Sequence, residues 1–228
     1  MSPMKHRIFP LVLLLAACGG DSRTAEAKSA DSVASARGPA AEHPAPITPA
    51  PAWRKNPDSG ATLAQGEATT IETGPHTILW PAEAAELAPP YSVRASLRKR
   101  AGRLHEGYGL MFGGQNLDGG EAEQRYSYFL VRGDGSFLIK RRDGAQTPVV
   151  RDWTRHPDIA RDANGQGRHN DLEVRVGVDS VTFLVNGGPV ATVPASELAV
   201  RGRAGLRISH DVLVEAQGFA AEPGTVAP

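Results

Sequence analysis

The chain has 228 residues, with 25 basic and 25 acidic side chains, 18 prolines, 25 glycines and only 6% aromatic residues. This length suits one domain with a sizeable core, or two smaller domains. The formal net charge is zero and no run of Lys and Arg is longer than residues 98–100, so nucleic acid is not an expected partner. The single cysteine excludes an intramolecular disulfide, a four-thiolate zinc site and an iron–sulfur cluster.

Residues 1–17 have the features of a secretory signal peptide. Lys5 and Arg7 precede an apolar run at 8–15, which is followed by the small residues Ala16 and Ala17. The run is about ten residues long, whereas a helix needs about 20 residues to cross the hydrocarbon core of a bilayer. The segment is therefore predicted to be a cleaved signal and not a permanent membrane span.

Residues 15–18 (LAAC) resemble the lipobox of bacterial lipoproteins. The resemblance implies that Cys18 becomes the first residue after cleavage and carries lipid on its thiol and its amine. Each buried CH₂ of an acyl chain contributes about 0.8 kcal/mol, so three chains would anchor the protein to a membrane. Gly19 in place of an aspartate after the cysteine implies outer-membrane sorting, with the protein facing the periplasm. An ordinary signal peptide with an incidental cysteine is the alternative.

Residues 18–52 are predicted to be a disordered tether. Val33 and Ile47 are the only branched aliphatic residues of this stretch, so it cannot bury enough apolar surface to offset the entropy of ordering. Its second half is rich in proline and is expected to be stiffened toward polyproline II. The folded domain is expected at 53–220, followed by a disordered tail at 221–228.

From Trp53 onward, short stretches of alternating apolar and polar residues are separated by turn residues, which is typical of an all-β protein. The alternation is clearest in 91–98 and 171–176. Further strands are predicted at 77–80, 108–112, 125–131, 136–141, 181–185, 190–193, 206–208 and 212–219. Turns are expected at 133–135, 179–180 and 186–188, and only 82–87 and 195–198 are predicted to be helical. About ten strands in about 160 residues indicate two stacked antiparallel sheets, a jelly-roll sandwich.

The order of several segments resembles the concanavalin A-like lectin/glucanase superfamily. The segments are YGLMFGG at 108–114, YSYFLV at 126–131 with the GDG hairpin at 133–135, NDLEVRV at 170–176, FLVNG at 183–187 and GRAGL at 202–206. The later ones are similar to its laminin-G-like and 3-keto-disaccharide hydrolase-like branch. The resemblance implies a β-sandwich that often meets carbohydrate, in a superfamily of enzymes, lectins and adhesion modules, so it does not fix a function.

The candidate catalytic groups are few. Glycoside hydrolysis uses two carboxylates about 5 Å apart for retention or about 6.5–9.5 Å apart for inversion. The glucanase branch carries them in an E-x-D-x-x-E run, which this chain lacks. The nearest approach, at Asp118, Glu121 and Glu123, contains two glycines that favour a solvated loop, and no G-x-S-x-G elbow is present. No catalytic residue is assigned, and a hydrolase of the 3-keto-disaccharide type is the alternative function.

Metal-binding candidates are scattered along the chain. Laminin-G-like modules hold calcium with aspartate and backbone oxygens, and Asp118 and Asp134 would suit this role, although both also suit turns. The histidines lack the paired spacing of a zinc-binding helix. No metal ligand or other cofactor is assigned, and calcium stays open.

Arg94, Arg175 and Arg207 are the candidate ligand-binding cations, because each occupies a polar-facing position of a predicted strand. If these strands are neighbours, the arginines would pair with Glu173 and Glu215, and each cross-strand pair would contribute about 0.2–1 kcal/mol. Alternatively, their guanidinium groups would bind acidic sugar or phosphate groups.

Four aromatic residues are candidates for stacking on a sugar ring: Trp80, Trp153, Tyr126 and Tyr128. The two tyrosines share a strand face with Leu130, whereas Trp153 lies in a loop-like stretch and is the expected exposed platform. The sequence therefore predicts a membrane-anchored envelope lipoprotein with a non-catalytic module that binds carbohydrate or an envelope partner. A purely structural module is the third hypothesis.

Overall fold

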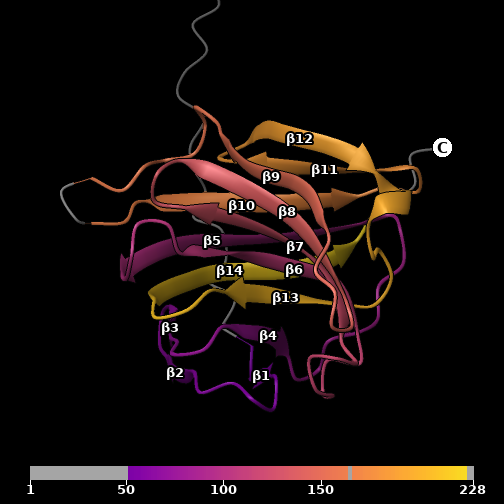
Figure 1. Ribbon diagram of the computed structural model, residues 1–228, viewed down its shortest axis with the longest axis horizontal. Helices are drawn as coiled ribbons and strands as arrows, with labels where there is room; N and C mark the ends of the chain where they lie inside the picture. The colour runs from indigo at the N-terminus through magenta and orange to yellow at the C-terminus, as the bar shows by residue number, and fades with distance from the viewer. Residues whose placement is uncertain (1–50, 164–165, 225–228) are drawn as a thin grey trace, which may run out of the picture. The chain divides into compact units, whose positions relative to one another are not determined.

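A computed structural model describes residues 51–163 and 166–224 of the chain (Figure 1). These residues form fourteen strands in two seven-stranded sheets, and every pairing between neighbouring strands is antiparallel. The predictions for the signal peptide, Cys18 and nearly all of the tether fall on residues 1–50, outside the described part. No helix among the described residues is both long and apolar enough to cross a membrane.

Sheet A contains, in order, β1 (Trp53–Lys55), β4 (Thr77–Pro81), β13 (Arg203–Ile208), β6 (Gly107–Gln115), β7 (Arg125–Arg132), β8 (Ser136–Asp143) and β9 (Val149–Arg155). Sheet B contains, in order, β12 (Gly188–Pro194), β11 (Ser180–Val185), β10 (His169–Val176), β5 (Tyr91–Ala101), β14 (Leu213–Pro223), β3 (Thr69–Glu72) and β2 (Thr62–Gln65). A 3-10 turn, η1 (Ala195–Glu197), follows β12. In Figure 1 the edge strands β9 and β12 lie at the same end of the sandwich, at the top.

The main hydrophobic core lies between the two sheets. Val93 on β5 and Val174 on β10 are fully buried in it, as the alternation of these segments predicts. Phe183 on β11 lies against two phenylalanines of sheet A, with ring centroids 6.0 Å from Phe112 and 5.1 Å from Phe129. These contacts join side chains from opposite sheets, so the prediction of an all-β, two-sheet sandwich is confirmed.

The outer face of sheet A carries a second buried cluster. Tyr126, Tyr128 and Leu130 on β7 point to this face, whereas Phe129 and Val131 point into the main core, as predicted. The other buried members of the cluster are Ile78, Trp80, Met111, Leu117 and Leu138. Sheet A is therefore apolar on both faces, and its outer face is covered in part by the connection between β6 and β7.

Two local predictions are corrected by the structure. Trp153, predicted to lie in a loop-like stretch, belongs to the edge strand β9 (149–155), whose register against β8 shifts twice and so obscures the period of two. Residues 82–87 do not form a helix: a turn at 82–83 is followed by an irregular stretch, and Leu87 forms an antiparallel bridge with Gly202 through two 2.9 Å backbone hydrogen bonds. Strands β1, β2 and β3 were not predicted, and β14 continues to Pro223.

The hairpin between β11 and β12 forms at the predicted Asn186 and Gly187. Both residues have positive φ, 51° and 83°, as a two-residue hairpin of the favoured hand requires. The predicted turn at 133–135 likewise joins β7 to β8.

Candidate functional site

Arg94 and Arg175 lie on the outer face of sheet B, on the neighbouring strands β5 and β10. Arg94 donates to both carboxylate oxygens of Glu222 at 3.0 and 3.1 Å, and Arg175 donates to both of Glu173 at 2.7 and 3.0 Å. Their side chains are 53% and 60% exposed, so each pair contributes at most about 1 kcal/mol. Both guanidinium groups are thus already engaged by carboxylates of this chain.

Arg207 lies on the other sheet, on β13, so the three arginines do not form one site. Its guanidinium lies over the ring of Tyr128, 5.5 Å from the centroid.

Trp153 belongs to the outer face of sheet A, where it is half-buried and packs on the second cluster. The guanidinium of Arg132 lies 4.3 Å from its ring centroid, so this ring is stacked already and is not a free platform.

The connection between β6 and β7, residues 116–124, folds over this outer face and is called the 116–124 loop below. Leu117 inserts into the second cluster. The buried amide of Gln124 donates to the carbonyl oxygens of Leu117 and Gly119 at 3.3 and 2.9 Å, which holds the loop in a closed turn. Glu121 connects the loop to two other parts of the chain. Its carboxylate contacts His76, just before β4, at 2.5 Å and Arg142 on β8 at 3.3 Å.

His76 is neutral at neutral pH. Burial, followed by the positive charge of Arg207, lowers its pKa to about 4. Its Nδ1 lies 3.3 Å from Nε2 of His210, and its Nε2 faces Glu121. A neutral ring with its proton on Nε2 donates to Glu121 and accepts from His210, so the contact with Glu121 is a hydrogen bond and not an ion pair.

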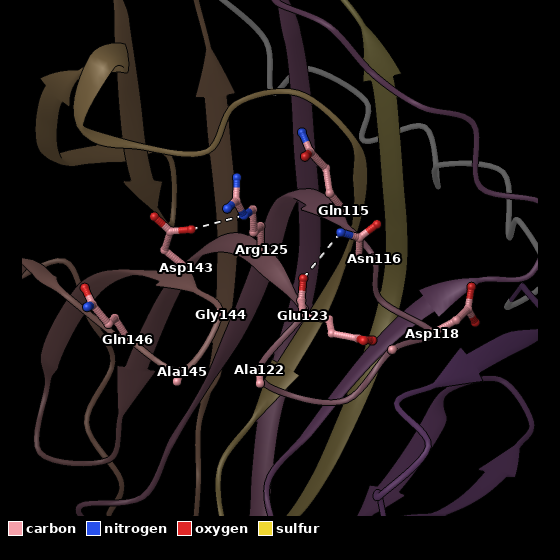
Figure 2. A pocket seen from close by; sticks show the side chains of 11 residues that line it. Gln115, Asn116, Asp118, Ala122, Glu123, Arg125, Asp143, Gly144, Ala145 and Gln146 are labelled. Carbon is pink, nitrogen blue, oxygen red and sulfur yellow. Dashed lines mark hydrogen bonds and ion pairs between the residues drawn. The ribbon is translucent and has the colours of Figure 1, made fainter.

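A solvent-open pocket of about 1040 Å³ lies where the 116–124 loop meets the hairpin between β8 and β9 (Figure 2). The lining residues are Gln115, Asn116, Asp118, Gly119, Ala122, Glu123, Arg125, Asp143, Gly144, Ala145 and Gln146. In Figure 2, Glu123 lies between Gln146 on one side and Asp118 on the other. The pocket is thus built from amide and charged groups contributed by two loops and by the ends of the strands beside them.

The hairpin and the 116–124 loop are attached to each other at the base of this pocket. The amide of Gly144 donates to the carbonyl oxygen of Gln124 at 2.9 Å. Gly144 has φ 61°, and a Cβ there would lie 2.7 Å from the carbonyl oxygen of Ala122, so glycine permits this approach. Above the base, Arg125 Nε is 3.1 Å from Asp143 (Figure 2). The wall can therefore offer a ligand both donors and acceptors.

The two candidate calcium ligands are engaged by other groups. Asp134 accepts hydrogen bonds from Arg132 Nε at 2.9 Å and from the amide of Ser136 at 3.0 Å, which stabilises the β7–β8 turn. Asp118 pairs with Arg54 and lies 3.8 Å from Arg203. Within 51–163 and 166–224, no three His, Cys, Asp or Glu side chains are grouped to hold a metal ion.

Sequence reasoning did not select Gln115, Arg125 or Gln146. Nothing in the local pattern distinguishes Gln115 and Arg125 from other strand ends, or Gln146 from other hairpin residues, and only the pairing of β6, β7 and β8 brings them to one rim. The glycines at 119 and 120 were the one available signal, since they indicated a loop beside Asp118.

The two-sheet β-sandwich fold is shared with solved structures that have 10–13% sequence identity to this chain. The carbohydrate binding module CBM66 from Bacillus subtilis matches with a TM-score of 0.59 at 13% identity, over 75% of this chain and 96% of that one. A Bacillus subtilis protein of unknown function with a galectin-like fold matches with a TM-score of 0.57 at 12% identity, over 75% and 88%. The exoplasmic/lumenal domain of VIP36, in its Ca²⁺/Man-bound form, matches with a TM-score of 0.55 at 10% identity. This match covers 77% of this chain and 84% of that one. No protein-family model and no curated protein matches this sequence.

Proposed function

We propose that this chain is a carbohydrate-binding β-sandwich module whose sugar site is the pocket of Figure 2. The observation that carries the proposal is the lining of this pocket by the amides of Gln115, Asn116 and Gln146 beside charged groups. An amide both donates and accepts hydrogen bonds, which matches the hydroxyl groups of a sugar. The carbohydrate-binding proteins among the structural neighbours support the same function.

The pocket carboxylates support a binding function better than a hydrolytic one. Asp143 is paired with Arg125, and Asp118 is paired with Arg54. The pocket has three carboxylates, those of Asp118, Glu123 and Asp143. Of these, only the Glu123 carboxylate has no ion pair or hydrogen bond to another described residue. Both stereochemical courses of glycoside hydrolysis use two carboxylates, so one free group favours a binding site.

Replacing Gln146 with alanine is expected to weaken glycan binding about tenfold, because one or two hydrogen bonds to the sugar are lost. The measurement is isothermal titration of the full-length protein with the best ligand from a glycan panel. Gln217→Ala, an exposed glutamine on sheet B, is the matched control and should leave the affinity unchanged. Equal affinities of the two variants would place the sugar elsewhere, and silence across the panel would favour an envelope protein as the partner.

We also propose that the module is an envelope lipoprotein anchored through Cys18, with the 18–52 stretch as its tether. Support comes from the charged start, the short apolar run and the placement of the chain's single cysteine after Ala16 and Ala17. Expression in a Gram-negative host is expected to yield a membrane-bound protein with three acyl chains on Cys18 by intact mass. Cys18→Ser is expected to remain unprocessed, and a wild-type mass without lipid would contradict the anchor.

A further inference from the structure

A second solvent-open pocket, of about 560 Å³, adjoins the pocket of Figure 2. It is lined by residues 86–88, by Arg201 and Gly202, and by Gln115 and Asn116. The last two residues also line the pocket of Figure 2, so the two pockets meet there. Because both pockets open to solvent, a chain-like ligand can pass from one to the other over Gln115 and Asn116. The two pockets together are called the trough below.

The walls of the second pocket are attached to one another. Leu87 and Gly202 exchange two backbone hydrogen bonds of 2.9 Å, and the side chain of Leu87 is buried in the main core. The side-chain amide of Gln115, at the end of β6, donates to the carbonyl oxygen of Arg201 at 3.0 Å. The second pocket is therefore formed before any ligand binds, so little of the binding free energy is spent on ordering it.

The two shared residues offer hydrogen-bond acceptors at the junction of the pockets. Asn116 Nδ2 donates to the carbonyl oxygen of Glu123 at 3.4 Å (Figure 2), and Gln115 Nε2 is engaged as described above. The side-chain oxygens of both amides have no partner among the described residues, so they can accept from sugar hydroxyl groups. In Figure 2 both amides lie across the pocket from Gln146. A glycan that reaches from Gln146 to these oxygens would therefore extend toward the second pocket.

The charged groups of the trough favour an uncharged glycan. In the second pocket, Glu86 and Arg201 are exposed, and neither side chain forms an ion pair or hydrogen bond with another described residue. Both can therefore bind hydroxyl groups of a further sugar unit. Along the whole trough, acidic lining residues outnumber basic ones: Glu86, Asp118, Glu123 and Asp143 against Arg125 and Arg201. This balance would disfavour a polyanionic glycan.

We propose that the second pocket is a further subsite for the same glycan, and that the ligand is a neutral oligosaccharide long enough to occupy both pockets. The inference rests on the sugar site proposed above and names its substrate class. Small-ligand sites typically measure about 300–1,000 Å³, so each pocket can hold sugar units by itself. Once one end of the chain is bound, the other end binds from a high effective concentration, and the affinity rises with chain length.

The probes are the disaccharides and hexasaccharides of the cello-, manno-, xylo- and laminari- series, with hexagalacturonate as the acidic probe, titrated into the full-length protein by calorimetry. At least one neutral hexasaccharide is expected to bind tenfold or more tightly than its disaccharide, and more tightly than hexagalacturonate. Arg201→Met keeps the backbone carbonyl that Gln115 contacts but removes the guanidinium donors. It should remove most of the gain for the hexasaccharide and leave the disaccharide unchanged. Arg155→Met, at an exposed arginine of β9 outside both pockets, is the matched control.

The outcomes separate this subsite from the sugar site itself. If disaccharide and hexasaccharide bind equally well and Gln146→Ala weakens both, the sugar site stands and the second subsite is wrong. Equal losses in Arg201→Met and Arg155→Met would show a general charge effect and overturn the role of Arg201. Binding of hexagalacturonate as tight as that of the neutral hexasaccharides would overturn the neutral class. If none of these probes binds, the inference is wrong, and the Gln146→Ala test on the wider glycan panel decides the sugar site separately.

Discussion

Replacing Phe183 with alanine is expected to lower the free energy of unfolding by about 3–5 kcal/mol. The side chain is fully buried and touches Phe112 and Phe129 of the opposite sheet, so its removal leaves a cavity in the middle of the sandwich. Neighbouring strands cannot close this cavity without breaking the pairing of Phe183 with Val174 and Ala191. Urea denaturation followed by tryptophan fluorescence measures the change.

Ser180→Ala is the matched control for this variant. Ser180 is exposed at the start of the same strand, and the change is expected to stay within about 0.5 kcal/mol. A loss of less than about 1 kcal/mol for Phe183→Ala would mean that the strand is shifted by one residue, which would turn Phe183 outward.

Replacing Asp162 with alanine is expected to cost about 3 kcal/mol or more, because it leaves the charge of Lys99 buried without its partner. Lys99 Nζ lies 2.9 Å from Asp162, and the two side chains are 4% and 10% exposed. Lys99 also donates to the carbonyl oxygen of Arg103 at 3.0 Å. A Cβ on Gly133 would lie 2.0 Å from the Asp162 carboxylate, so glycine at this turn permits the contact.

The double variant Lys99→Met with Asp162→Ala distinguishes an unpaired charge from a lost contact. Removing both charges is expected to recover most of the stability, since an apolar side chain replaces a buried ion. Thermal and urea denaturation of the two variants give the comparison. If the double variant is as unstable as Asp162→Ala, the loss comes from packing of the 156–163 segment and not from the charge of Lys99.

The residues of the main core were predictable because alternation along a strand is a local property. An extended backbone sends successive side chains to opposite faces, so the pattern of 91–98 and of 126–131 identified the buried residues on each face. The hairpins at 133–135 and at Asn186 and Gly187 were equally local, because their backbone conformations suit the residues present.

The candidate site was not predictable in this way. Chain order does not reveal that β13 lies between β4 and β6, or that Arg207 is in a different sheet from Arg94 and Arg175. The pocket needs residues of the 116–124 loop and of the β8–β9 hairpin, which meet only through the pairing of three strands.

The sequence by itself thus determined the fold class, most strands and the residues that fill the sandwich. The tertiary structure alone decided that the outer face of sheet A carries a buried cluster, and that Glu121, His76 and Arg142 meet over it. The physical reason is that side-chain alternation depends on neighbours two residues apart, whereas strand order and loop docking depend on contacts between segments far apart in the chain.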